Sequence, residues 1–358
     1  MAFRDVRRRY DGRYLSMQTF QLASVYSVGQ CRYALPNMAH RICNRASGRP
    51  AQRAKREIHR MPIATDTLRV IELGQHLIGF YDGRVEGKRA FGAEPNWLDD
   101  GGYALGICSY AIYSGTEALV YDTHLSVPHA QRIRDVLSAR GVKTIRVVLS
   151  HWHLDHIAGN AAFGDCEIIA QDKTISLLQK HRIAIESGEL DGPPTISPLV
   201  MPTKSFTGEV TVDVGGVQVD LKPLDIHSCD GVALYLPHDG TLLAGDTLED
   251  TVTYVDEPER LEVHLADLDR MKSWPFTRIL PNHGSFERIG SSGYDRSLIS
   301  ATEDYVHRLI RSANDEALCK LDLRSFLGAT PDTGAISYFA PYEDVHRSNI
   351  LKIQSAVR

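Results

Sequence analysis

The sequence predicts an α/β fold in which two β-sheets pack together and helices cover their outer faces. Short segments rich in β-branched and aromatic residues, separated by turn residues, dominate the middle of the chain. Helical patterns with one apolar face lie between these segments. The 358 residues, of which 43% are hydrophobic, suffice for one large domain or a domain with appendages. We therefore expect an antiparallel-rich pair of sheets with helices around it.

The first part of the regular region alternates strands and helices. A helix is predicted over residues 128–140, because Pro128 suits a first turn, Ile133 and Leu137 share an apolar face, and Gly141 follows. A second helix is predicted over 172–186. The strands expected in this part are 68–73, 76–81, 106–114, 118–122 and 145–150.

The second part of the chain repeats this mixture. A helix marked by Leu261, Leu265 and Leu268 precedes its last strand, and two or three helices close the chain from about Ser300 and from about Glu343. The strands expected here are 210–214, 217–224, 231–237, 241–246 and 278–281.

Residues 1–60 differ from the rest of the chain. They carry twelve Arg and one Lys against three acidic residues, a net charge of +10, and show no clear apolar period. We expect a basic, disordered extension, followed by one domain over residues 61–358. A start codon assigned upstream of Met61, a transit-type peptide and a basic arm for an acidic partner are the three interpretations, and the first is preferred. If the start codon was assigned upstream of Met61, residues 1–60 are expected to be dispensable for folding and activity.

Charge and composition argue against several classes of protein. The remainder of the chain carries a net charge of −15, which repels nucleic-acid phosphates, so a nucleic-acid partner is not expected. No apolar run approaches the roughly 18–20 residues that a membrane span needs. The six cysteines form no CxxC pair and no disulfide framework, which favours reduced thiols in a cytoplasmic protein. A small-molecule substrate is the expected partner.

The main functional signal is the segment His151-Trp152-His153-Leu154-Asp155-His156. It follows a buried strand directly. Three imidazoles and a carboxylate in six residues would each need a hydrogen-bonding partner if buried, at roughly 1–3 kcal/mol for each unsatisfied group. A divalent metal ion satisfies them together, because imidazole and carboxylate are ligands for zinc and similar ions.

The segment LSHWHLDHIAG resembles the HxHxDH signature of the metallo-β-lactamase superfamily. The rest of that family's pattern can be followed through residues 67–290. YDTH offers Asp122, LDIHSCDG offers His227, LLAGDT offers Asp246 and ILPNHG offers His283. The resemblance implies an αββα sandwich of two mixed β-sheets flanked by helices.

The resemblance also implies a dinuclear metal site. Two Zn²⁺ ions are expected, with iron or manganese as alternatives, and a hydroxide that they share would attack a carbonyl-type substrate. Asp155 and Asp246 are the expected catalytic carboxylates, Asp155 as a proton shuttle and Asp246 as a bridge. Asp122 would orient the HxHxDH turn. The implied ligands are His151, His153 and His227 for one metal, Asp155, His156 and His283 for the other, and Asp246 for both.

The substrate stays open among esters, thioesters, lactones and amide-like bonds. A bridging aspartate argues against a dedicated β-lactamase, because true β-lactamases of the superfamily generally lack it. Many lactonases place a tyrosine a few residues after this aspartate, whereas here the nearest is Tyr254. The basic C-terminal portion of glyoxalase II has no match in 291–358. A phosphodiesterase or nuclease and an iron-dependent oxidoreductase are the alternatives, and dimers are common among similar enzymes, so a homodimer is the candidate assembly.

Candidate pocket residues come from three places. The loop between Gln171 and Phe206 is too long for a simple connection, which favours a role in the substrate pocket. His124 and His264 are further candidates at the rim of the pocket. The side chains expected to line the pocket are Ile196, Leu199 and Met201 in the loop, and Trp97, Tyr103 and Trp152 as an aromatic wall.

Overall fold

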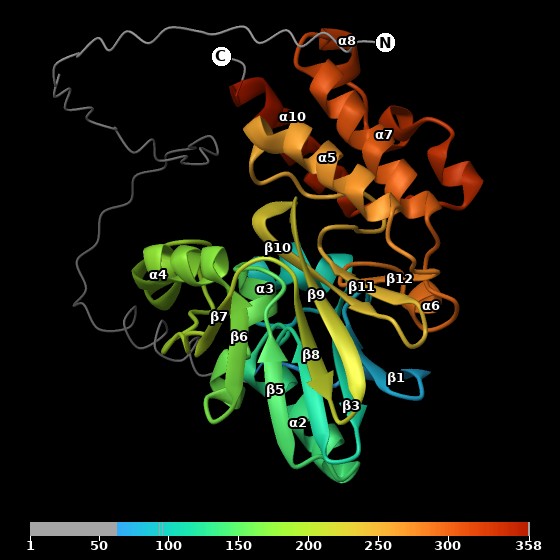
Figure 1. The fold of residues 1–358 in the computed structure, drawn as a ribbon. Coiled ribbons are helices and arrows are strands. Elements are labelled where there is room, and N and C mark those ends of the chain that lie inside the picture. The colour runs from blue at the N-terminus through green and yellow to red at the C-terminus, as the bar shows by residue number, and fades with distance from the viewer. Residues whose placement is uncertain (1–62, 93, 95, 357–358) are drawn as a thin grey trace, which may run out of the picture. The chain divides into compact units, whose positions relative to one another are not determined.

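The computed structural model describes residues 63–92, 94 and 96–356. The basic extension expected over residues 1–60 lies outside the described residues. Two β-sheets stack face to face, and helices cover the outer face of each, as Figure 1 shows. The αββα sandwich expected from the sequence is therefore confirmed.

The first sheet is mixed and has seven strands in the order of the sequence. Strands β1 to β4 pair antiparallel, whereas β4 to β7 pair parallel. Its strands are β1 (Arg69–Gly74), β2 (Leu77–Asp82), β3 (Ile107–Ser114), β4 (Glu117–Tyr121), β5 (Thr144–Val148), β6 (Glu167–Gln171) and β7 (Lys204–Phe206).

The second sheet has five strands in the order β12-β11-β10-β9-β8. All neighbouring strands pair antiparallel except β11 and β12. These two run parallel, and the connection between them contains a helix. The strands are β8 (Val210–Val214), β9 (Val217–Ile226), β10 (Ser228–Leu236), β11 (Thr241–Gly245) and β12 (Arg278–Pro281).

Helices from two parts of the chain cover the two sheets. Apolar residues of α2 and α4 pack against the outer face of the first sheet, while α5 packs on β9 and α7 and α10 pack beside it. The α-helices are α2 (Val127–Ala139), α3 (Leu154–Ile157), α4 (Asp172–Ser187), α5 (Leu261–Lys272), α6 (Phe286–Ile289), α7 (Ser297–Ser312), α8 (Glu316–Cys319), α9 (Leu323–Leu327) and α10 (Tyr342–Ala356). Shorter helical turns are η1 (Asp99–Tyr103), η2 (Asn160–Phe163), η3 (Pro258–Arg260) and η4 (Thr330–Thr333).

Two strands of the first sheet were not predicted. β6 and β7 are short, and β7 holds only Lys204–Phe206 at the edge of the sheet. Neither segment shows the alternation that marks a half-buried strand, since β6 is buried along nearly its whole length. Together they extend the sheet past β5, the strand from which the HxHxDH segment emerges.

Buried tyrosines of the first sheet hold the second sheet in position. Tyr110 donates a hydrogen bond to the carbonyl oxygen of Pro281 (2.5 Å), and Tyr81 donates one to that of Gly284 (2.8 Å). Tyr121 reaches the carbonyl oxygen of Val232 in the same way. These phenols satisfy buried carbonyl oxygens, and Tyr110 and Tyr81 fix the turn after β12 at both of its ends.

The C-terminal helix α10 is tied to the loop that follows β11. Asn349 is fully buried; its side-chain oxygen accepts from the backbone N–H of Val255 (2.8 Å), and its amide nitrogen donates to the carbonyl of Thr253 (2.9 Å) and to Tyr305 (3.0 Å). Helix α10 thereby contributes to the wall of the cavity described below.

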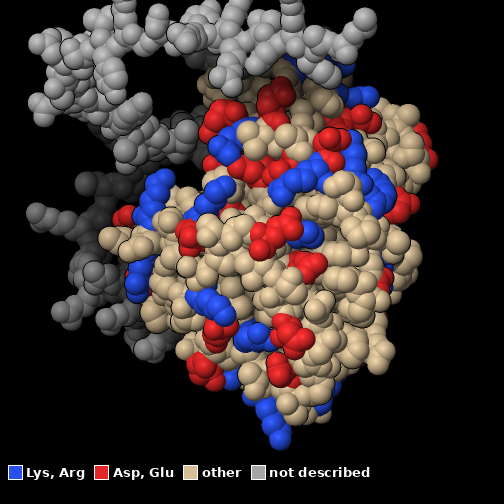
Figure 2. Space-filling view, viewed as in Figure 1, with Lys and Arg blue, Asp and Glu red and all other residues tan. Residues whose placement is uncertain are grey.

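The surface carries both signs of charge. Figure 2 shows Lys and Arg interspersed with Asp and Glu on one face. Ion pairs between such residues include Arg270 with Asp267. Among the described residues, no helix combines the length and the apolar character that crossing a membrane requires.

Replacing Asn349 with alanine is expected to destabilise the domain by about 2–4 kcal/mol. The change leaves the Val255 N–H and the Thr253 carbonyl buried without a partner, at roughly 1–3 kcal/mol per group. Denaturant unfolding followed by circular dichroism measures the loss. Arg347→Ala, an exposed change on the same helix, is the matched control, and equal stability of the two variants would contradict this role of Asn349.

Candidate metal centre

Seven side chains converge where strands of both sheets end. β5 leads into the segment with His151 and His153, and helix α3 carries Asp155 and His156. His227 stands between β9 and β10. Asp246 follows β11, and His283 follows β12. Their ligating atoms form groups within 4.8 Å: His151, His153 and His227; His151, His156 and Asp246; Asp155, His156 and His283. The structure thus brings together all seven residues that the sequence analysis singled out.

Asp246 lies at the centre of this cluster. Its Oδ2 atom is 3.0 Å from Nε2 of His156 and 3.2 Å from Nε2 of His283. The same oxygen is 3.7 Å from Nε2 of both His151 and His227. One carboxylate oxygen therefore faces imidazoles from all three groups.

Backbone and side-chain acceptors fix the orientation of the imidazoles. Nδ1 of His283 lies 2.8 Å from the carbonyl oxygen of Gly106, and Nδ1 of His227 lies 3.1 Å from that of Tyr254. A carbonyl oxygen only accepts, so each Nδ1 carries a proton, and each Nε2 faces the cluster, where a bound cation would take the place of a second proton. Hydrogen bonding beside the ring thus prepares these two histidines as ligands.

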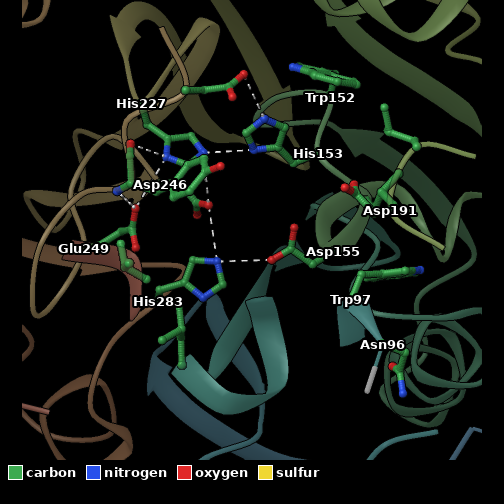
Figure 3. Close-up of a pocket in the computed structure, with 16 residues that line it drawn as sticks. Asn96, Trp97, Trp152, His153, Asp155, Asp191, His227, Asp246, Glu249 and His283 are labelled. Atoms are coloured by element: carbon green, nitrogen blue, oxygen red, sulfur yellow. Dashed lines mark hydrogen bonds and ion pairs between the residues drawn. The ribbon is translucent and has the colours of Figure 1, made fainter. Parts of the chain in front are cut away.

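His153 is turned the other way from its neighbours. Its Nδ1 faces the cluster, 3.0 Å from Nε2 of His227, whereas its Nε2 points to Asp256 at 3.7 Å (Figure 3). Two imidazole nitrogens this close need either a proton between them or a cation that binds both.

The donor set fits divalent cations. Nε2 of His151 and Oδ1 of Asp246 are buried without any hydrogen-bond partner among the described residues. Unpartnered buried polar atoms are costly, and here they belong to an imidazole and a carboxylate, which are ligands for zinc and similar ions. The residues present therefore match what a metal ion would need.

The electrostatics show how strongly the carboxylates act on the imidazoles. Burial alone would lower the pKa of His156, but the carboxylates of Asp155, Asp246 and Asp122 raise it well above its ordinary value. Burial lowers the pKa of His151 well below its usual range, and the neighbouring His156 and His153 act in the same direction. The carboxylates of the cluster therefore favour positive charge beside them, whereas the low pKa of His151 disfavours protonation of every imidazole at once.

Asp122 lies behind the cluster, as the sequence analysis expected. It is fully buried and accepts hydrogen bonds from the backbone N–H of Ser150 (2.6 Å) and from Nδ2 of Asn282 (2.6 Å). Its Oδ2 is 2.9 Å from Nδ1 of His156. From the end of β4, Asp122 therefore contacts three places that lie at or beside ligands: the end of β5, helix α3 and the end of β12.

Two residues of the site, and a third close to Asp122 in the sequence, adopt a left-handed backbone conformation that non-glycine residues rarely take. They are Asp122 (φ 65°), His124 (φ 68°) and His227 (φ 68°), and among the described non-glycine residues only Arg84 joins them. Such strain persists where the surroundings determine the conformation. At Asp122 and His227 it directs the side chains toward the cluster.

The cluster opens into a cavity of about 570 Å³, a volume typical of small-molecule sites. Figure 3 shows Asp155 and His283 on one side of it and Trp97, Trp152 and Asp191 on another. The lining residues are Asn96, Trp97, Leu105, Trp152, His153, Leu154, Asp155, Leu190, Asp191, His227, Asp246, Glu249, Tyr254, Asp256, His283 and Val345.

Several pocket predictions were wrong. Ile196 and Leu199 are buried in the core beneath the first sheet, and Met201 packs against that core, because the proline-containing loop folds back onto α4. Tyr103, expected in the aromatic wall, is buried in a separate apolar cluster with its hydroxyl on Thr67 (2.9 Å). The loop does reach the cavity, but through the residues just after α4.

The two candidate histidines also lie away from the cavity lining. His124 is fully buried, stacks on His129 with 4.7 Å between ring centroids, and accepts from the N–H of Leu125. His264 is fully buried on α5. Both are part of the packed interior.

The sequence analysis missed Asn282 and Glu249. Asn282 binds Asp122, and Glu249, also buried, lies 3.5 Å from Nδ1 of His227. Their one sequence signal is proximity, since Asn282 directly precedes His283 and Glu249 follows Asp246 by three residues. Polar residues next to ligands at strand ends are where such supporting contacts arise.

Comparisons with known proteins agree with this geometry. The sequence profile described as the metallo-beta-lactamase superfamily matches residues 103–283, about half of the chain. A beta-lactamase-like protein 2 homolog of Caenorhabditis elegans is 25% identical over 183 residues, which are 50% of this chain and 56% of that protein. The Drosophila melanogaster homolog is 26% identical over 199 residues, or 53% and 63%. The match thus spans less than two thirds of either relative.

Solved structures share the fold. A metallo-beta-lactamase from Pontibacter korlensis superimposes with a TM-score of 0.51 at 17% identity, covering 67% of this chain and 99% of that protein. The DIM-1 metallo-beta-lactamase gives a TM-score of 0.51 at 18% identity, covering 68% and 98%. These likenesses concern the fold alone.

Replacing Asp122 with asparagine is expected to weaken zinc binding about 10- to 100-fold. The amide cannot accept from all three donors, and it removes the charge that orients His156. Competition with a chromophoric chelator measures the zinc dissociation constant. Asp269→Asn, which removes an exposed carboxylate on α5, is the control, and equal zinc affinity in both variants would show that Asp122 does not support the site.

Proposed function

The chain belongs to the metallo-beta-lactamase superfamily, whose members are typically metal-dependent hydrolases, and we propose that it hydrolyses a carbonyl-type bond with two divalent cations. The observation that carries the proposal is the position of Asp246 Oδ2, within 3.7 Å of four imidazole nitrogens. A carboxylate in this position is suited to bridge two cations. Zinc is the proposed metal, and the bond is an ester, thioester, lactone or amide-like bond.

The ligands divide into two sets around Asp246. One cation would be held by His151, His153 and His227, and the other by Asp155, His156 and His283. When bound, such a pair supplies a hydroxide near neutral pH and polarises the oxygen of the bond under attack.

The chain's own residues prepare the site for this chemistry. The carbonyls of Gly106 and Tyr254 hold Nδ1 of His283 and His227, so Nε2 of each ring faces the cluster and would bind a cation in place of its proton. Asp122 holds Nδ1 of His156 in the same way, and Nε2 of His156 faces Asp246.

Asp155 is suited to move a proton. It is 16% exposed, lines the cavity and faces His283 Nε2 through its Oδ2 atom (3.3 Å). Asp122, in contrast, is fully buried and can only orient its neighbours. The Asp155 carboxylate can therefore take a proton released near the cluster and give it to a leaving group in the cavity.

The charge of the cavity favours a carbonyl substrate over a phosphodiester. Its lining contains five carboxylates and, among the described residues, no Lys or Arg. A polyanion would meet no basic side chain there, whereas phosphate recognition usually relies on Arg and Lys.

Hydrolysis of at least one chromogenic ester, thioester or lactone is expected from the zinc-loaded protein. Chelation should abolish the activity, and added zinc should restore it at about two ions per chain. Bis(p-nitrophenyl) phosphate in the same panel tests the alternative. Turnover by metal-free protein, or cleavage of the phosphodiester alone, would refute the proposal.

Asp246→Asn is expected to retain about one metal ion and to lose activity by 10²-fold or more. A neutral amide offsets less of the repulsion between two divalent ions, so one ion is lost. Asp246→Glu would keep two ions at an altered distance and remain impaired. Elemental analysis and turnover are measured on the same samples, and two tightly held ions with near-normal turnover in Asp246→Asn would rule out a bridging role.

A further inference from the structure

One wall of the cavity combines two indole rings with a carboxylate. Trp97, Trp152 and Asp191 line it, and Figure 3 shows the Asp191 carboxylate pointing into the hollow toward His153 and Asp155. None of the three belongs to the seven proposed ligands. They come from the segment before η1, from the HxHxDH turn and from the loop after α4.

The indole rings are held in place. Nε1 of Trp97 donates to the carbonyl of Pro194 (2.9 Å), in the loop that also carries Asp191. Trp152 stacks on His181 of α4, with ring centroids 4.7 Å apart and planes inclined by 23°. Both aromatic surfaces are therefore preorganised.

Four of the five carboxylates in the lining already face a partner. Asp155 and Asp246 lie against the imidazoles, and Glu249 lies beside His227. Asp256 contacts Nζ of Lys352 at 3.2 Å. The proposed cations would be offset by the first three of these groups.

Asp191 is the fifth carboxylate and has no such partner among the described residues. The residue is exposed. Partial desolvation raises the pKa of its carboxyl group, His153 and Lys352 lower it, and the neighbouring Asp155 and Asp256 raise it. Its charge is thus the one left to attract a group that enters the cavity.

A carboxylate beside aromatic rings is a recognition site for an organic cation. Ammonium groups bind over indole faces, and most strongly over Trp, when they are removed from water. A substrate carboxylate or phosphate at this wall would be repelled by Asp191.

We propose that Trp97, Trp152 and Asp191 bind a positively charged amine of the substrate, while the bond to be cleaved lies at the metal centre. The proposal rests on the hydrolase function proposed above and narrows its substrate class to carbonyl compounds that bear an ammonium group. Leu190, Leu154 and Leu105 add apolar surface to the lining of the cavity.

Binding of two ligands of the same shape tests the proposal without turnover. Choline and 3,3-dimethylbutan-1-ol differ in the positive charge. Isothermal titration of the zinc-loaded full-length protein is expected to show at least tenfold tighter binding of choline. Asp191→Asn should reduce the affinity for choline to that for the neutral alcohol, and Trp97→Leu should weaken choline binding.

Glu189→Gln is the matched control, because Glu189 precedes Asp191 by two residues, is exposed and lies outside the cavity lining. It should leave the preference for choline unchanged. Equal binding of the two ligands, no choline binding at millimolar concentration, or an Asp191→Asn variant that still prefers choline would overturn the proposal.

Turnover of acetylcholine and of 3,3-dimethylbutyl acetate separates this proposal from the hydrolase function. A kcat/KM ratio that favours the cationic ester and disappears in Asp191→Asn supports both. Equal kcat/KM values for the two esters would leave the hydrolase function standing and overturn the cationic subsite. Tighter binding of choline than of the neutral alcohol, with no hydrolysis of any substrate, would support the cationic subsite and refute the hydrolase function.

Discussion

The geometry of the whole site is arranged around a single oxygen atom, Oδ2 of Asp246. This oxygen faces four imidazoles from three separate segments, which places one negative charge where two groups of ligands meet. Five imidazoles and two carboxylates so close together lose much of their hydration. The fold must therefore hold these side chains in a fixed orientation, and bound cations would offset the free energy lost when the side chains leave water.

The orientation comes from contacts that join the two sheets. Tyr110 and Tyr81 hold the turn after β12 at Pro281 and Gly284, on either side of His283. Asp122, in a left-handed conformation, joins the ends of β4, β5 and β12. Buried hydrogen bonds of this kind leave the ligands little freedom, so the geometry exists before any ion binds. The helices complete the cavity from outside, since α10 contributes Val345 and α4 supports Trp152 through His181.

Local patterns predicted a pair of sheets with helices and the metal-binding character of the HxHxDH segment, whereas the αββα sandwich and the remaining ligands came from the family resemblance. Strands show as β-branched segments, and the ligands sit in short motifs directly after them. The cavity wall was less predictable, because it depends on how long loops fold. Leu190 and Asp191 reach the cavity, whereas Ile196 and Leu199 of the same loop enter the core, and no spacing in the sequence distinguishes them. Asn282 and Glu249 act through contacts that only the folded chain brings about.

Crystallographic anomalous scattering tests the central claim most directly. Data collected above and below the zinc absorption edge from crystals of the zinc-loaded chain locate the metal without reference to activity. Two peaks are expected, roughly 3.5–4 Å apart, with the carboxylate of Asp246 between them. One should lie against His151, His153 and His227, and the other against Asp155, His156 and His283. A single peak, or two peaks that do not share Asp246, would contradict the dinuclear site.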